Sequence, residues 1–242
     1  DELGVTQQSE GFTRYRHWNF DATPADNYPL LLHYPYYLLY SSQVVKQADL
    51  VFALYLFGDQ FSIEQKRRDF AYYEAITVRD STLSAAIQAI VAAEVGYLDL
   101  ALDYFRESGA IDLHDLAGNT ADGLHLAALS GTLLVAAAGF GGMRDYGPTL
   151  AFAPRLPASL TRLSFRMLFR SRHLSIEIHP DRVTYQLLSG APLEVLHYDE
   201  PVTLAVPSPL TCSIPPLPEA VPVALPPRRA APWLRGAASD DA

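Results

Sequence analysis

The order of apolar and polar residues divides the chain into a helical part and a part built from strands. From about Ser42 to Gly142, apolar residues recur at helical spacing, whereas beyond Gly142 they alternate with polar residues at every second position. A repeat of about 3.6 residues is typical of helices, and a repeat of two is typical of half-buried strands. The sequence therefore predicts helices followed by a small sheet structure.

Five helices are predicted in the first part. Residues 43–57 are apolar on nearly every side, which is typical of a helix buried on most faces. Residues 62–73 begin with a Ser-Ile-Glu-Gln capping box, and residues 83–96 and 98–109 each form an apolar stripe that ends at a glycine. A last apolar helix is expected at about residues 124–138.

Buried helices alternate with amphipathic ones, as in two concentric layers, and the predicted fold class is α+β. Residues 1–144 are interpreted as the C-terminal half of an (α/α)6 toroid, because twelve helices usually close such a ring. Residues 145–206 predict a small antiparallel, jelly-roll-like β-sandwich, because each strand has one apolar face. Nine of the 18 prolines lie in residues 207–242, which predicts an extended, largely disordered tail.

Composition narrows the possible partners. Apolar residues make up 49% of the chain and charged residues 19%, enough for a packed core. The net charge of −9 argues against nucleic acid or an anionic membrane as a partner. Residues 123–143 carry no charged side chain, but they lack the flanking basic and aromatic residues of a membrane span, so a buried helix is predicted.

The start of the chain and its cysteine content bear on its cellular location. The chain begins with neither Met nor a secretory signal, which predicts that it is part of a longer protein. Its single cysteine, Cys212, cannot form a disulfide within the chain. A cytoplasmic location is expected.

No short catalytic motif is present. The sequence contains no P-loop, no GxSxG and no HExxH, and its seven histidines lack metal-ligand spacing. Neither a metal nor an organic cofactor is predicted. The Gly-rich residues 139–142 follow a helix, so a C-terminal cap and tight turn is the preferred interpretation.

Four strings, in a fixed order, carry a resemblance. They are Val-Lys-Gln-Ala-Asp at 45–49, Arg-Asp-Ser-Thr-Leu-Ser at 79–84, Asp-Gly-Leu-His at 122–125 and Gly-Phe-Gly-Gly-Met-Arg at 139–144. Together they resemble glycoside hydrolase family 65, the maltose, trehalose and kojibiose phosphorylases, over about residues 1–205. The resemblance implies an inverting α-glucoside phosphorylase acting on an α-linked glucose disaccharide, with inorganic phosphate as co-substrate.

The resemblance also implies residue roles. Lys46 and Gln47 would hold the glucosyl unit, while Ser81, Thr82 and His125 would bind phosphate. Thr82 departs from the family's second serine; it keeps a hydroxyl but adds a stiffening methyl group. The family's general acid lies in a segment that precedes this chain, so no catalytic residue is assigned here, and the chain alone is expected to be inactive.

Other interpretations of these residues stay open. Lys46 could pair with Asp49 or another internal carboxylate, Ser81 could be a plain N-cap, and His125 could be a satisfied core histidine. The five assigned residues are nevertheless expected to meet in one cavity at the rim of the incomplete ring.

Two other functions and two partners are also considered. An inverting hydrolase of the trehalase or kojibiose-hydrolase type would place a carboxylate, rather than hydroxyls and an imidazole, opposite the anomeric carbon. A non-catalytic carbohydrate-binding fragment is the third reading. The expected protein partner is the N-terminal part of the enzyme, and a homodimer of the full-length protein is left open.

Overall fold

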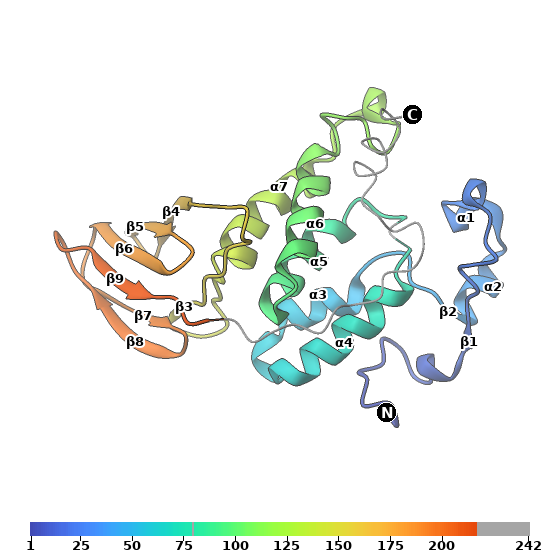
Figure 1. Ribbon diagram of the computed structural model, residues 1–242, viewed down its shortest axis with the longest axis horizontal. Coiled ribbons are helices and arrows are strands. Elements are labelled where there is room, and N and C mark those ends of the chain that lie inside the picture. Colours follow the sequence, from blue (N-terminus) through green and yellow to red (C-terminus); the bar gives the residue numbers. More distant parts are fainter. Residues whose placement is uncertain (79, 217–242) are drawn as a thin grey trace.

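The computed structural model describes residues 1–78 and 80–216. A helical body lies in the middle of the molecule, a β-sandwich lies at one end, and the short helices α1 (Leu30–His33) and α2 (Tyr36–Tyr40) lie at the other (Figure 1). Between the chain start and α1 the backbone is mostly irregular. The short strand β1 (Arg16–His17) in this segment pairs in parallel with β2 (Ser42–Gln43), which follows α2.

The helical body consists of five longer helices and a π-helical turn. They are α3 (Asp49–Leu56), α4 (Ile63–Ile76), α5 (Ser84–Val95), α6 (Leu98–Ala110), α7 (Leu126–Leu134) and η5 (Val135–Phe140). Helices α3, α5 and α7 pack side by side, while α4 and α6 each pack against α5. Helix α5 is buried on almost every face, and α6 buries only one. This alternation is that of the predicted half toroid.

The helix boundaries follow the predicted caps at two places. Ser62 is the N-cap of α4, and its Oγ accepts a hydrogen bond from the backbone N–H of Gln65 at 3.2 Å. Gly96 ends α5 with φ at 101°, in the left-handed region that glycine adopts without strain. Local sequence signals therefore fix these two ends.

The predicted helix at residues 43–57 is wrong in its first part, because α3 begins only at Asp49. Val45 forms a parallel bridge with Thr77, in which its N–H donates to Ile76 and its carbonyl accepts from Val78. Backbone groups engaged in this bridge cannot also join a helical ladder. Residues 44–48 are consequently not helical: Val45 is bridged to Thr77, and Lys46 and Gln47 form a bend before α3.

The helix predicted at residues 124–138 is also different. It begins at Leu126, and after Leu134 it widens into the π-helical turn η5. Its first half is not buried, since Leu126 and Leu133 are 71% and 75% exposed. Among the described residues, no helix has both the length and the apolar character needed to cross a bilayer.

The β-sandwich contains two sheets around a common core. One sheet has the order β3-β7-β8 and the other β4-β5-β6-β9. All pairings are antiparallel except β3 with β7, which is parallel. The inner faces share a core that includes Phe152, Ile176, Tyr185 and Val195. The strands are β3 (Leu150–Phe152), β4 (Leu163–Phe169), β5 (Arg172–Ile178), β6 (Arg182–Ser189), β7 (Leu193–His197), β8 (Glu200–Leu204) and β9 (Leu210–Ser213).

Strand β9 corrects the predicted start of the tail at residue 207. It pairs with β6, with Val183 opposite Cys212 and Tyr185 opposite Leu210. Prolines flank β9 at 209 and 215 but do not interrupt it, so its backbone can complete the sheet. The predicted disorder of residues 217–242 lies outside the described residues.

A glycine-rich turn joins the helical body to the sandwich. Gly142 has φ at 59°, and a Cβ atom built on it would lie 2.1 Å from the carbonyl oxygen of Ala153. A Cβ on Gly141 would lie 2.9 Å from the ring of Phe165 in β4. These glycines therefore form the expected turn. They also allow the backbone at Ala153 and the ring of Phe165 to pack directly against the turn.

A buried ion-pair cluster crosses the same junction. Glu94, near the end of α5, accepts hydrogen bonds from Lys66 of α4 at 2.6 Å and from Arg144 at 2.8 Å. Burial alone would raise the pKa of Glu94, but Arg144 and Lys66 together hold that pKa below its usual range. Arg144 also lies over the ring of Tyr55, 5.0 Å from its centroid.

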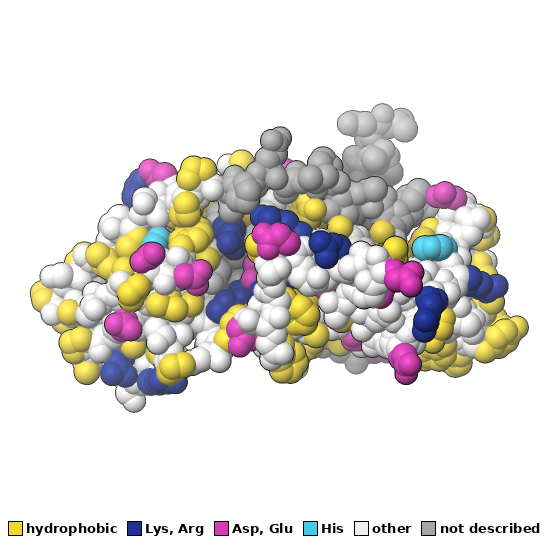
Figure 2. All heavy atoms as spheres, turned by 90° about the horizontal axis from the view of Figure 1, so that it is seen from below, with side chains coloured by type: hydrophobic (Ala, Val, Ile, Leu, Met, Phe, Trp, Pro, Cys, Tyr) yellow, Lys and Arg dark blue, Asp and Glu magenta, His cyan; other side chains and the backbone are white. Residues whose placement is uncertain are grey.

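The helical body leaves large apolar side chains exposed on two of its helices. Phe52, Leu56 and Phe57 on and after α3 are 39–54% exposed, and Leu126 and Leu133 of α7 are more exposed still. Hydrophobic side chains also gather at the end of the molecule that carries α1 and α2, seen in Figure 2 beside Lys and Arg side chains. Large apolar patches of this kind are typical of surfaces that another polypeptide covers.

We expect the chain in isolation to associate rather than remain monomeric. Size-exclusion chromatography with light scattering should give a mass above 26.7 kDa that rises with concentration. A double variant, Leu126→Lys with Leu133→Lys, should reduce this association. Leu168→Lys is the matched control, because Leu168 is 63% exposed but lies in β4, outside the helical body. A cooperatively melting monomer would contradict the expectation.

Candidate functional site

The residues that sequence analysis assigned to a site share one rim of the helical body. Helices α3, α5 and α7 run in the same direction, with α4 and α6 returning between them (Figure 1). Their C-terminal ends meet at the cluster of Glu94, Arg144 and Tyr55. Their N-terminal ends therefore form the opposite rim, where the five assigned residues lie: Lys46 and Gln47 before α3, Ser81 and Thr82 before α5, and His125 before α7.

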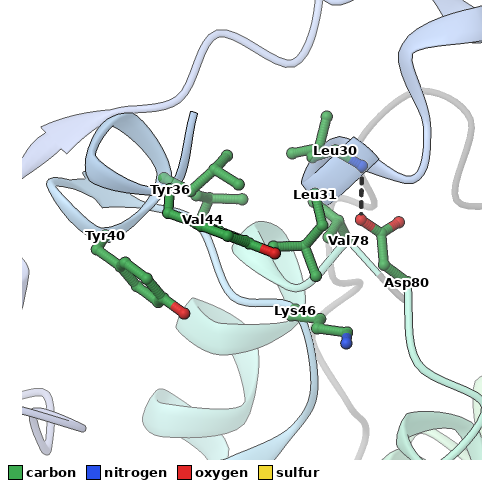
Figure 3. A pocket seen from close by; sticks show the side chains of 9 residues that line it. Leu30, Leu31, Tyr36, Tyr40, Val44, Lys46, Val78 and Asp80 are labelled. Carbon is green, nitrogen blue, oxygen red and sulfur yellow. Dashed lines mark hydrogen bonds between the residues drawn. The ribbon is translucent and has the colours of Figure 1, made fainter. Parts of the chain in front are cut away.

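A pocket of about 290 Å³ opens beside this rim. Its polar lining comes from the phenol groups of Tyr36 and Tyr40, the ammonium group of Lys46 and the carboxyl group of Asp80 (Figure 3). The remaining lining is aliphatic: Leu30, Leu31, Leu39, Val44 and Val78. Aromatic rings beside a few convergent polar groups are typical of small-ligand sites.

Asp80 is the residue of this pocket that the sequence assignment left without a role. Its Oδ2 accepts a hydrogen bond from the backbone N–H of Leu30 at 2.8 Å. Burial raises the pKa of Asp80, an effect that this hydrogen bond and the charge of Lys46 only partly oppose. A carboxyl group with a raised pKa inside a pocket is a candidate functional group. The sequence signal that could have identified Asp80 was its position in the second string, directly before Ser81.

Lys46 occupies a different environment from the one predicted. It lies in the bend before α3, is exposed, and lines the pocket near Asp80. Lys46 therefore does not lie inside the apolar helix that was predicted at residues 43–57. Asp49, the alternative partner, accepts a hydrogen bond from Nε2 of Gln47 at 3.0 Å instead.

Ser81 and Thr82 lie in a turn that precedes α5. The N-cap position is Leu83, so the interpretation of Ser81 as a plain N-cap is wrong. The backbone N–H of Leu83 donates to Ser81 Oγ at 3.3 Å. Both hydroxyl-bearing residues are half-buried, and they follow Asp80 directly.

His125 is the N-cap residue of α7 and is tied to Asp112. Its backbone N–H donates to Asp112 Oδ2 at 2.8 Å, and its Nδ1 lies 2.6 Å from Asp112 Oδ1. The hydrogen bond to the ring holds the pKa of Asp112 below its usual range. The side chain of His125 is 17% exposed, so it is not a fully enclosed core histidine.

The pocket contains Lys46 but not the other four assigned residues. Gln47, Ser81, Thr82 and His125 precede α3, α5 and α7 at the N-terminal ends of these helices, and their contact with a ligand remains a prediction. Among residues 1–78 and 80–216, no group of three or more His, Cys, Asp or Glu side chains is arranged to hold a metal ion.

Comparison with known proteins identifies the family. The glycosyl hydrolase family 65 central catalytic domain matches residues 1–134, and the family 65 C-terminal domain matches residues 143–204. The chain belongs to glycosyl hydrolase family 65. The resemblance carried by the four strings is thereby confirmed.

Several family 65 proteins are similar over most of this chain. A glycosyl hydrolase of Mycobacterium leprae (strain TN) is 47% identical over 216 residues, which are 88% of this chain and 27% of that protein. The α,α-trehalose phosphorylase of Thermoanaerobacter brockii is 37% identical over 203 residues, covering 84% of this chain and 26% of the enzyme. A solved structure described as a putative kojibiose phosphorylase from human microbiome superposes with a TM-score of 0.80 at 24% identity, covering 88% of this chain and 29% of that one.

The family 65 chain thus spans about a quarter of the length of these relatives. The structural similarity at 24% identity establishes the fold: a helical region followed by a β-sandwich. The matched catalytic domain ends within α7, and the matched C-terminal domain begins at Met143, in the glycine-rich turn.

Proposed function

We propose that this chain is the C-terminal portion of an inverting α-glucoside phosphorylase. The observation that carries the proposal is the set of groups on one rim: a pocket with Lys46, the adjacent hydroxyls of Ser81 and Thr82, and an imidazole, His125, already oriented by a carboxylate. Several hydroxyl and imidazole donors suit a phosphate better than they suit a neutral water nucleophile. Relatives named as trehalose, maltose and kojibiose phosphorylases support it.

In this proposal the chain binds both reactants. Lys46 and Gln47 hold hydroxyl groups of the glucosyl unit, because an ammonium and an amide can donate to sugar oxygens. Ser81, Thr82 and His125 hold inorganic phosphate on the opposite face of the anomeric carbon. Phosphate is already anionic, so inversion needs only one carboxyl group, which protonates the leaving oxygen. That acid belongs to the rest of the whole protein, and the isolated chain is inactive.

Asp80 favours a second candidate, an inverting hydrolase of the same family. Its carboxyl group lines the pocket beside Lys46, and an inverting hydrolase needs a second carboxyl group to activate water. The hydrogen bond from Leu30 occupies Oδ2 of this group. Anchoring the segment at Leu30 is therefore a simpler role for Asp80 than activating water, and phosphorolysis remains the preferred function.

Phosphate dependence of the full-length protein tests the proposal. Trehalose, maltose and kojibiose are incubated with and without inorganic phosphate, and glucose 1-phosphate and free glucose are quantified. We expect equimolar glucose and glucose 1-phosphate, no turnover without phosphate, and, from inversion, the β anomer by proton NMR. Free glucose released at the same rate without phosphate would establish the hydrolase instead.

A substitution in this chain should change how the full-length protein binds phosphate. Thr82→Val removes the hydroxyl group and keeps the shape, so KM for phosphate should rise about tenfold, the usual loss for one hydrogen bond to a charged group. Ser130→Ala is the control, since among the described residues the Ser130 hydroxyl bonds only to the carbonyl oxygen of Ala127 within α7. Equal kinetics for the two variants would remove Thr82 from the phosphate site.

A further inference from the structure

One carboxylate in the loop between α6 and α7 makes two hydrogen bonds to a single residue. Asp112 contacts His125 through both of its oxygens, at the backbone N–H and at the ring Nδ1. The side chains are 7% and 17% exposed, respectively, so both contacts are largely shielded from water. Two bonds from one rigid carboxylate fix the position of the ring as well as that of the chain at the start of α7.

The same contacts determine where the ring proton lies. The hydrogen bond to His125 lowers the pKa of Asp112, so its carboxylate is ionised at neutral pH and can only accept. Nδ1 of His125 must then carry the proton, which leaves the lone pair of a neutral ring on Nε2. Within residues 1–78 and 80–216, Nε2 of His125 has no hydrogen-bond partner.

His197 in the sandwich shows the contrasting case. Its Nδ1 lies 2.9 Å from the hydroxyl of Tyr185, and its Nε2 lies 2.9 Å from the carbonyl oxygen of Ser213. Both of its ring nitrogens are used within the fold. The ring of His125 is instead anchored at one nitrogen only, at the rim where the assigned ligand groups lie.

We propose that Asp112 is a positioning residue that keeps a proton on Nδ1 of His125 and leaves Nε2 to the phosphate, where it accepts from a phosphate hydroxyl or, once protonated, donates to a phosphate oxygen. This inference rests on the proposed phosphate site and extends it to a residue that does not touch the ligand. When the ring is protonated, Nδ1–H donates to Asp112 and Nε2–H donates to the anion. The carboxylate thereby supports the charged ring that the anion requires.

Asp112→Asn should reverse the ring proton. The backbone N–H of His125 cannot lose its proton, so the amide oxygen of Asn stays with it and the amide NH2 faces the ring. The ring then accepts at Nδ1 and carries its proton on Nε2, as a carboxylate-to-amide change does to the histidine of a catalytic triad. If Asp112 had only a structural role, its replacement would loosen the loop without favouring either tautomer of the His125 ring.

Acylation by diethyl pyrocarbonate distinguishes a changed tautomer from a merely loosened loop, and it can be measured on this chain without the rest of the enzyme. The reagent attacks a ring nitrogen with a free lone pair, and peptide mass spectrometry follows His125 at micromolar protein concentration. We expect Asp112→Asn to slow the reaction several-fold, because Nε2 is protonated and Nδ1 is engaged. Asp99→Asn, which removes an exposed carboxylate in the first turn of α6, should leave the rate unchanged. An unchanged or faster rate in Asp112→Asn would overturn the proposal.

Kinetics of the full-length protein provide the second readout. Asp112→Asn should raise KM for inorganic phosphate about tenfold, the lower end of losses for groups that orient a ligand-binding histidine. KM for the disaccharide should stay within about twofold, and Asp99→Asn should change neither constant. Equal changes in both KM values would overturn the phosphate part of the proposal. If the protein needs no phosphate at all, the proposed function fails, while the acylation rates still decide the role of Asp112.

Discussion

Replacing Glu94 by alanine is expected to lower the free energy of unfolding by about 3–5 kcal/mol, the range for breaking a buried ion pair from one side. The reason is that Lys66 and Arg144, whose side chains are 5% and 11% exposed, would both lose their carboxylate partner. Two buried cations would then face each other. Urea unfolding followed by circular dichroism, at concentrations where the signal is independent of protein concentration, measures the change.

An exposed ion pair in the sandwich is the control for this substitution. Glu177 contacts Arg162 at 2.6 Å, but these side chains are 41% and 54% exposed, so Glu177→Ala should have little effect on stability. A similar loss in both variants would show that the burial of the Glu94 cluster is unimportant. Glu94→Gln, which keeps the shape and removes the charge, should fall between wild type and Glu94→Ala.

The same carboxylate should make stability depend on pH. Because Arg144 and Lys66 overcome the effect of burial, the pKa of Glu94 in the folded protein lies below its unfolded value of about 4.5. A lowered pKa means that the folded state binds the proton less tightly than the unfolded state does. The stabilisation is therefore complete above about pH 4.5 and is lost as the pH falls through the folded-state pKa. Glu94→Gln should abolish this component.

Gly142→Ala is the second substitution with a large expected effect, a loss of roughly 2–5 kcal/mol. Two costs combine: about 1–2 kcal/mol for a Cβ in the left-handed region and about 1–3 kcal/mol for steric overlap. The overlap arises because the new Cβ would lie 2.1 Å from the carbonyl oxygen of Ala153, a backbone atom that cannot rotate away. The midpoint of thermal or urea unfolding gives the size of the effect.

Gly118→Ala isolates the conformational part of that cost. Gly118 has φ at 67°, close to that of Gly142, but a Cβ built on it would have no neighbour within 4 Å. The difference between the two variants therefore measures the overlap at the junction alone. Equal losses would mean that the turn can shift away from Ala153 and that the close approach has no energetic weight.

The elements predicted most accurately were those specified by local signals. The Ser62 capping box, the Gly96 cap and the alternation in β4, β5 and β6 depend on neighbouring residues and on burial of one face. Residues 44–48 could not be placed in the same way. They are as apolar as a helix, but the bridge between Val45 and Thr77 joins segments more than thirty residues apart, and periodicity carries no information about such a partner.

The same distinction applies to the candidate site, where local strings identified some residues and only the fold identified others. Three of the four strings located the rim, because each ends just before or at the start of a helix, and family resemblance supplied the roles of Lys46, Gln47, Ser81, Thr82 and His125. The fourth string, at 139–144, lies at the opposite end of the helices, in the junction with the sandwich. Asp112 could not be found in this way. It lies thirteen residues before His125 in an irregular loop, and only the fold brings the two together. The aliphatic side of the pocket likewise depends on how the segment at Leu30 folds back onto Asp80.

Strand β9 has a practical consequence for anyone who shortens this protein. The matched C-terminal domain ends at residue 204, and a truncation designed on that boundary would delete residues 210–213. The N–H and C=O groups of β6 that now bond to β9 would become a free sheet edge. Such an edge is a template on which a second chain can add a strand, so the truncated protein would be prone to intermolecular β-pairing and fibrous aggregation.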